Sequence, residues 1–270
     1  LTVSLPTASL VTGTTIIIIP EPSIENLAAN LVINSISVNP SFRFKGSDAS
    51  VSGWPAWTYG SNASFVDTGT DPSFNQSSAA ILATDESVIF NNACRFPAST
   101  TEMDISTEDF VFEMVYRAVS TAGDSYYFNK WATTNTDGWW IGCDTPSNVL
   151  RLSLDDVTDA TRVDVTSAAG SQVAGTWYHA MVFVDRSGFG QWYINGVASG
   201  SAVDVTTIAS LSNAVAMNIG CLRSDGISFC NAGAITLLCG WKQASWLDTH
   251  LQGTLALARY QALTSGQTLT

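Results

Sequence analysis

Short apolar runs alternate with clusters of turn-forming residues along most of the chain. From residue 41 onward a turn signal recurs about every 8 to 15 residues, and apolar and polar positions tend to alternate within the runs. Alternation with a period of two is typical of β-strands, whereas helical periodicity is limited to 21–31 and a short piece after Leu263. The pattern predicts an all-β, two-sheet antiparallel sandwich. The predicted strands are 87–92, 110–118, 125–132, 138–143, 149–155, 177–185, 190–197, 216–221, 234–240 and 254–260.

The run WYHAMVFVD, at 177–185, is largely apolar on both of its alternating faces. A strand of this kind lies inside a sheet that is covered on both sides, so we expect His179 to be a hydrogen-bonded core residue and not a catalytic base. The following RSGFG forms a turn, in which Gly188 and Gly190 are free to take a positive φ. Asn195-Gly196 then predicts a type I′ hairpin into the next strand.

Residues 1–40 differ in composition from the rest of the chain. They hold four prolines and only two charged residues, and the Ile16–Ile19 run combines strong β propensity with almost no charge nearby. Such a run aggregates when it is exposed, so we expect it to pair with a sheet edge, either of the same chain or of a neighbour. We therefore divide the chain into an extended N-terminal arm or first strand at 1–40 and a β-sandwich domain at 41–270.

Several motifs follow one another along the chain, namely FVFEMVYRA, GWWIG, LRLSL, TWYHAMVFVDRSGFGQWYINGV and NIG. Their order resembles the laminin-G-like group of concanavalin A-like jelly rolls. The W-x-H strand with its terminal Asp and the Y-x-N-G hairpin of that group match Trp177, His179, Asp185, Tyr193, Asn195 and Gly196. The resemblance extends over about residues 44–268 and implies a jelly-roll sandwich in which these conspicuous side chains serve packing.

The net charge of −12 and the presence of only three lysines restrict the partners. Nucleic acids and anionic membrane surfaces would be repelled, so neither is expected. No apolar stretch approaches the roughly 18 residues of a membrane span, and the N-terminus lacks the basic region of a secretory signal. The five cysteines contain no C-x-x-C pair, so we expect buried thiols and no zinc site.

The strongest catalytic candidates are Glu102, Asp104 and Glu108, because laminarinase-type glucanases of the resembled fold use a similar carboxylate strand. A retaining pair requires about 5 to 5.5 Å between its carboxyl groups, whereas Asp104 and Glu108 would be about 13 Å apart along an extended strand. We therefore expect no catalytic residues and no cofactor. Many relatives hold a calcium ion at the rim of the sandwich, and the loops 46–53 and 66–71 are the candidate sites for such an ion in this chain.

Nine tryptophans are many for a chain of this length. Several aromatic residues fall in stretches that read as loops, where exposed rings stack on sugars. The candidate carbohydrate-binding residues are Trp54, Trp57, Tyr59, Trp241 and Trp246. The alternative is that these rings cap the ends of a wide sandwich core.

Three functions are compatible with the sequence. The first is a non-enzymatic structural or adhesive jelly-roll module of a surface assembly, such as a phage capsid decoration or tail-fibre protein, because relatives of the resembled fold are frequent there. It implies an oligomer whose chains bind one another through residues 1–40, at a virion or extracellular surface. The alternative is a carbohydrate-binding, lectin-like module with glycans as partners. The third is a laminarinase-type glycoside hydrolase.

Overall fold

The computed structural model describes residues 104–117, 125–132, 137–144, 148–156, 161–215, 217–219, 234–242 and 251–264, and the backbone of short strands at 42–45, 58–59, 88–89 and 94–95. The arm expected at 1–40 and the helix expected at 21–31 lie outside these residues. No helix in the described part of the chain has the length and hydropathy of a transmembrane segment.

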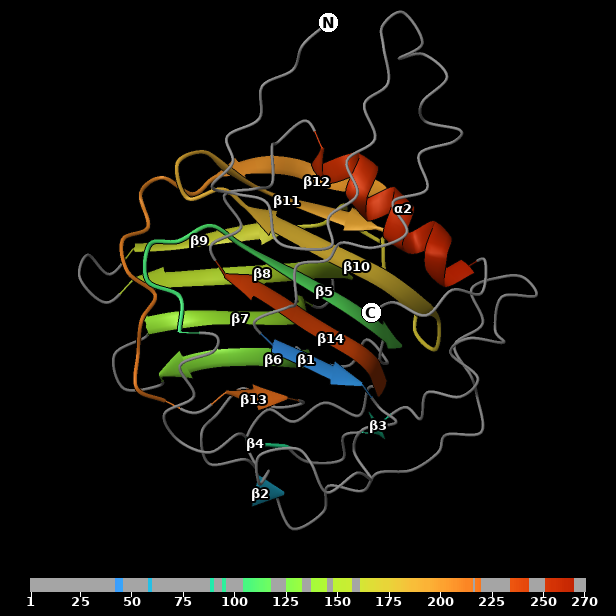
Figure 1. The fold of residues 1–270 in the computed structure, drawn as a ribbon, viewed down its shortest axis with the longest axis horizontal. Coiled ribbons are helices and arrows are strands. Elements are labelled where there is room, and N and C mark those ends of the chain that lie inside the picture. The colour runs from blue at the N-terminus through green and yellow to red at the C-terminus, as the bar shows by residue number, and fades with distance from the viewer. Residues whose placement is uncertain are drawn as a thin grey trace, which may run out of the picture. The chain divides into compact units, whose positions relative to one another are not determined.

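Two antiparallel sheets form the fold, and one crosses in front of the other in Figure 1. Sheet A has the order β1 (Phe42–Lys45), β14 (Ala234–Lys242), β5 (Phe110–Arg117), β10 (Trp177–Val184), β11 (Phe189–Ile194), β12 (Val197–Asp204), and β3 (Val88–Ile89) also pairs with β14. Sheet B has the order β2 (Thr58–Tyr59), β4 (Cys94–Arg95), β13 (Asn218–Ile219), β6 (Ser125–Ala132), β7 (Asp137–Asp144), β8 (Val149–Asp156), β9 (Thr161–Thr166). The predicted all-β, two-sheet sandwich is therefore confirmed.

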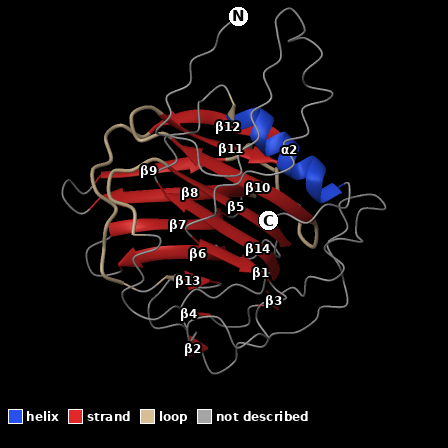
Figure 2. Ribbon diagram, in the orientation of Figure 1, coloured by secondary structure: helices blue, strands red, loops and turns tan. Residues whose placement is uncertain are grey.

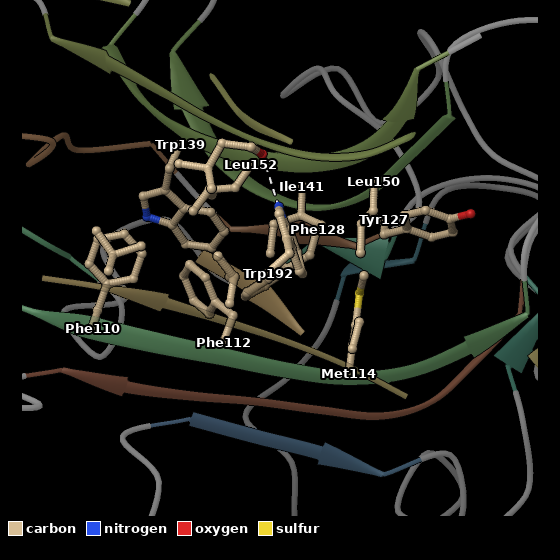
Figure 3. Packing of buried hydrophobic residues seen from close by; sticks show 14 of the residues in the cluster. Phe110, Phe112, Met114, Tyr127, Phe128, Trp139, Ile141, Leu150, Leu152 and Trp192 are labelled. Carbon is tan, nitrogen blue, oxygen red and sulfur yellow. Dashed lines mark hydrogen bonds between the residues drawn. The ribbon is translucent and has the colours of Figure 1, made fainter. Parts of the chain in front are cut away.

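Aromatic side chains from both sheets fill the core between them. Phe112 of sheet A packs against Trp139 and Phe128 of sheet B, with ring centroids 4.5 and 5.6 Å apart (Figure 3). Trp192 of β11 lies in the same core, and its Nε1 donates a hydrogen bond of 2.9 Å to the backbone oxygen of Val165 in β9. The buried indole thus satisfies its polar atom and joins the two sheets at once.

The predicted central strand and hairpin are confirmed. All eight residues of β10 are buried, and β10 pairs with β5 on one side and β11 on the other. Asn195 and Gly196 have φ values of 51° and 78°, as the type I′ turn between β11 and β12 requires. The positive φ values suggested for Gly188 and Gly190 are absent, because Asp185 organises that turn by accepting hydrogen bonds from the backbone amides of Ser187 and Gly188.

The strand predicted at 254–260 is wrong, since this segment lies in helix α2, Gln252–Thr264. Alternation of Leu255 and Leu257 with small residues resembles a strand, but Leu257 is exposed while Leu255 is buried. The buried residues of α2 recur every three or four positions, at Gln252, Leu255, Ala256, Arg259 and Leu263. The helix packs against β10 and β12 of sheet A, as Figure 2 shows.

Candidate functional site

The outer face of sheet A holds a buried ionic cluster where α2 covers it. The guanidinium of Arg259, in α2, donates two hydrogen bonds of 2.6 Å to the carboxylate of Glu113 in β5. His179 Nε2, in β10, lies 2.8 Å from Glu113 Oε1. Glu113 and His179 are both 0% exposed, and Arg259 is 7% exposed. The cluster therefore attaches α2 to two neighbouring strands.

The electrostatics of this cluster match a structural role. Burial alone would raise the pKa of Glu113, but the positive charge of Arg259 and the hydrogen bonds from His179 and Arg259 outweigh it and lower the pKa to about 2. Glu113 is therefore ionised, and a charged carboxylate accepts its bond from the Nε2–H of His179. The ring of Tyr260 stacks on His179 at 6.1 Å between centroids. His179 is the hydrogen-bonded core residue that the sequence predicts.

Asn195 links the hairpin turn to strand β10 through two hydrogen bonds. The side-chain Oδ1 of Asn195 accepts a hydrogen bond of 2.9 Å from the backbone amide of His179. The backbone amide of Asn195 donates one of 2.8 Å to the backbone oxygen of His179. Asn195 thus extends the hydrogen-bonded pairing of β11 with β10 as far as the turn. Together, His179 and Asn195 hold β10 and β11, and the imidazole of His179 is not exposed to solvent.

The candidate glucanase carboxylates also serve local structure. Asp104 accepts hydrogen bonds from the Ser212 hydroxyl at 2.7 Å and from the Asn213 amide at 3.0 Å, and its Oδ1 lies 3.6 Å from Lys130 Nζ. Glu108 accepts a bond of 2.6 Å from the backbone amide of Ser106. Glu102 lies outside the described residues. No group of three or more His, Cys, Asp or Glu in the described ranges is arranged to hold a metal ion, and the suggested calcium loops fall outside those ranges.

Of the predicted sugar-binding aromatic residues, the structure describes Trp241 and the backbone of Tyr59. Trp241 is 4% exposed on the outer face of sheet A, with the Arg259 guanidinium 5.5 Å from its ring centroid. It belongs to strand β14 and not to the loop that the sequence suggested. Tyr59 belongs to β2, and Trp54, Trp57 and Trp246 lie outside the described residues.

A second group of polar and aromatic side chains lies on the outer face of sheet B. We call it the sheet B face, and it comprises Tyr126, Asn129 and Trp131 of β6, Trp140 and Asp144 of β7, Arg151, Ser153 and Asp155 of β8, and Arg162 and Asp164 of β9. The strand register places these residues in rows across the sheet. One row runs Trp131, Gly138, Asp155, Arg162, and the next runs Asn129, Trp140, Ser153, Asp164.

Aromatic rings form the centre of the sheet B face. Tyr126 and Trp140 meet edge to face at 5.1 Å, and Trp131, which is only partly buried, packs against them. The positions on either side of Trp140 that share its face of β7, residues 138 and 142, are glycines. Two guanidinium groups lie over the Trp140 ring, that of Arg162 at 5.3 Å and that of Arg151 at 5.7 Å.

Carboxylates neutralise both arginines of this face. Arg151 bonds to Asp144 and lies 3.6 Å from Asp164, while Arg162 Nε donates a bond of 2.9 Å to Asp164 Oδ1. Asp155 differs from the other two acids because it is buried, and because Trp131 and Ser153 are the hydrogen-bond partners of its carboxylate. Burial raises its pKa to about 6, although the charge of Arg162 opposes that shift.

Comparison with known proteins identifies the family. Residues 91–245, more than half of the chain, match the sequence profile of the concanavalin A-like lectin/glucanases superfamily. The chain belongs to the concanavalin A-like lectin/glucanases superfamily. This confirms the resemblance to concanavalin A-like jelly rolls. No curated protein matches the sequence.

Solved structures show the superfamily fold at low identity. The binding domain of botulinum neurotoxin serotype G superposes with a TM-score of 0.53 at 13% identity, covering 83% of this chain and 51% of that one. The receptor binding domain of botulinum neurotoxin D superposes with a TM-score of 0.51 at 10% identity, covering 77% and 47%. The chain thus spans about half the length of these domains, and the likeness concerns the fold.

The sheet B face was not predicted from the sequence, because the apolar residues of β6 to β8 read as core strands alone. A signal was present in β8, where Arg151, Ser153 and Asp155 alternate with leucines and therefore share one face. Arg162 and Asp164 alternate with valines in the same way. Polar residues that alternate with core residues indicate a strand face that points away from the core.

Proposed function

We propose that this chain is a non-catalytic carbohydrate-binding module and that the sheet B face holds the glycan. The observation that carries the proposal is the partly open ring of Trp131 beside buried carboxylate and hydroxyl groups. The C–H face of a sugar ring packs on an aromatic face, and polar groups around it bind the hydroxyls. A rigid sheet positions both kinds of group without a mobile loop.

Membership of a superfamily that includes lectins and glucanases is compatible with this function. The glucanase alternative is not favoured, because Asp104 and Glu108 are engaged by backbone amides and a neighbouring chain segment.

Trp131→Ala tests the proposal. Loss of the stacking ring is expected to weaken glycan binding by about tenfold or more, which corresponds to about 1.4 kcal/mol. Glycan-array screening followed by titration calorimetry on the bound glycan measures the change. Phe189→Ala is the control, because Phe189 is 56% exposed on β11 of the other sheet. Equal binding by wild type and Trp131→Ala, or a loss of the same size in Phe189→Ala, would contradict the assignment of the face.

A role in a surface assembly is a second proposal. The apolar Ile16–Ile19 run and the net charge of −12 support a chain that binds its own copies through residues 1–40 on a virion or extracellular surface. Replacing Ile17 and Ile18 by Ser in the full chain is expected to convert an oligomer into a monomer in sedimentation velocity. Val173→Ser, at an exposed loop position, is expected to leave the oligomer intact. A monomeric wild type would overturn this role.

A further inference from the structure

We infer that the sandwich carries a cation-binding site at one end of β6, and that the chain fills this site with its own Lys130 ammonium group. A variant that lacks the ammonium is therefore expected to bind a primary alkylammonium ion in the same place. The inference is independent of glycan binding, because Lys130 pairs with the core residue Trp139 and points to the inner side of sheet B.

The segment that crosses from sheet A to sheet B turns backbone oxygens toward buried cations. It connects β12 to β13 along one side of the sandwich (Figure 1). Near its beginning, Arg186 Nη2 donates a hydrogen bond of 2.5 Å to the backbone oxygen of Ile208. Near its end, Lys130 Nζ donates to the backbone oxygens of Asn213 and Val215. Carbonyl groups buried outside a strand need partners of another kind, and cationic side chains supply them here.

Four oxygen atoms lie around the Lys130 ammonium and form what we call the oxygen cage. They are the backbone oxygen of Asn213, its side-chain Oδ1 at 3.1 Å, the backbone oxygen of Val215 at 3.0 Å, and Asp104 Oδ1 at 3.6 Å. The side chain of Lys130 is 1% exposed. Carbonyl, amide and carboxylate oxygens are the groups with which proteins bind hard cations. The Lys130 ammonium thus stands in the position of a bound ion.

Hydrogen bonds that do not involve the ammonium hold the oxygen cage in place. Asn213 Nδ2 donates to the backbone oxygens of Lys130 at 3.0 Å and of Asp137 at 3.2 Å. The carboxylate of Asp104 accepts from the Ser212 hydroxyl at 2.7 Å and from the Asn213 amide at 3.0 Å. These bonds use backbone atoms and other side chains, so they survive when the Lys130 side chain is shortened. The oxygens are therefore expected to keep their arrangement without it.

The charge and the geometry of the oxygen cage favour a primary ammonium ion. Among the described acids, Asp104 is the one within ion-pair distance of Nζ, so the cage balances a single positive charge. A primary ammonium has three N–H donors, and three of the cage oxygens accept from Nζ. The side chain of Asp104 is 31% exposed, so the cage borders solvent on that side. Lys130→Ala removes the side chain beyond Cβ, which a propylammonium ion reproduces.

Thermal unfolding of the full chain tests the inference. Wild type and Lys130→Ala are compared in propylammonium, tetramethylammonium and calcium chlorides at equal ionic strength. At about ten times its dissociation constant, propylammonium is expected to raise the Tm of Lys130→Ala by about 3 °C or more above the value in tetramethylammonium. Tetramethylammonium has the same charge but no N–H donor, so it cannot bond to the cage. The Tm of wild type should be the same in both ammonium salts, because its site is filled.

Two further variants serve as controls. Lys130→Met fills the space of the lysine stem without a charge, so its Tm should not respond specifically to propylammonium. Asp104→Asn, added to Lys130→Ala, removes the counter-charge of the cage. It is expected to weaken the binding of propylammonium by about tenfold, since a charged acceptor becomes a neutral one. Titration of the Tm against propylammonium concentration measures this change.

The outcomes decide the inference in either direction. An equal Tm of Lys130→Ala in the two ammonium salts overturns it, as does a rise of the same size in Lys130→Met. Stabilisation by calcium without stabilisation by propylammonium also overturns it, because the cage would then select a metal ion. If Lys130→Ala does not fold alone, its refolding from urea is measured in the two ammonium salts. Recovery in propylammonium alone supports the site, and any other result contradicts it.

Discussion

Glu113→Gln is expected to lower the free energy of unfolding by about 3 to 5 kcal/mol, since it leaves the buried guanidinium of Arg259 without its counter-charge. Arg259 loses both of its hydrogen bonds of 2.6 Å to a carboxylate, and His179 loses its charged acceptor. Removing one partner of a buried ion pair costs far more than the pair itself contributes. Urea unfolding at pH 7, followed by tryptophan fluorescence, measures the change.

The double variant Glu113→Leu with Arg259→Met is the matched control. It removes both charges and fills the space with apolar atoms, so it should be less destabilised than Glu113→Gln alone. If the double variant is the less stable of the two, the uncompensated charge is not the cause of the loss.

The same cluster sets a dependence of stability on pH. The folded-state pKa of Glu113 is depressed to about 2, below its ordinary value of about 4.5. Its contribution to stability is therefore complete above about pH 4.5 and is lost as the pH falls toward 2. A shift of this size corresponds to about 3 kcal/mol. The difference in unfolding free energy between wild type and Glu113→Gln should narrow over this window and stay constant from pH 5 to pH 7.

Gly200→Ala is expected to cost more than about 4 kcal/mol or to prevent folding. Gly200 has a φ of 78° in β12, and a Cβ at this position would overlap the carbonyl oxygen of Thr166 in β9. The edge strands of the two sheets meet here, so a side chain would force the sandwich open at that edge.

Gly170→Ala separates the two causes of that loss. Gly170 has a similar φ of 69°, but a Cβ there meets no atom within 4 Å. It should cost only about 1 kcal/mol, from the left-handed backbone conformation. Urea unfolding of both variants tests the comparison, and equal losses would show that backbone strain, and not the contact between strands, dominates at Gly200.

The strands of the core could be predicted from the sequence to within a residue or two. β5, β6, β7, β8 and β10 are long, apolar on the inward face and bounded by turn residues. β9 was missed because only Val163 and Val165 turn inward, so the segment reads as a polar loop. α2 was missed because Leu255, Leu257 and Arg259 imitate the alternation of a strand.

The buried ionic cluster around Glu113 and the sheet B face could not be predicted in the same way. Glu113 and Arg259 are far apart in the sequence, and only the docking of α2 on sheet A brings them together. The rows of the sheet B face depend on register, and β6 carries a bulge between Tyr126 and Phe128 that shifts every later pairing with β7. Periodicity predicts that a residue points outward, but not which residue of the next strand it meets.

Because the sheet B face stands on four consecutively paired strands, it is a platform whose side-chain spacing is fixed before any ligand arrives. Little conformational entropy is then lost on association, which favours affinity for a given contact area. The same property makes the face a scaffold for engineering. Tyr126, Trp131, Arg162 and Asp164 belong to the outward set, so a randomised library at these positions would vary recognition while Phe112, Phe128 and Trp139 continue to hold the fold.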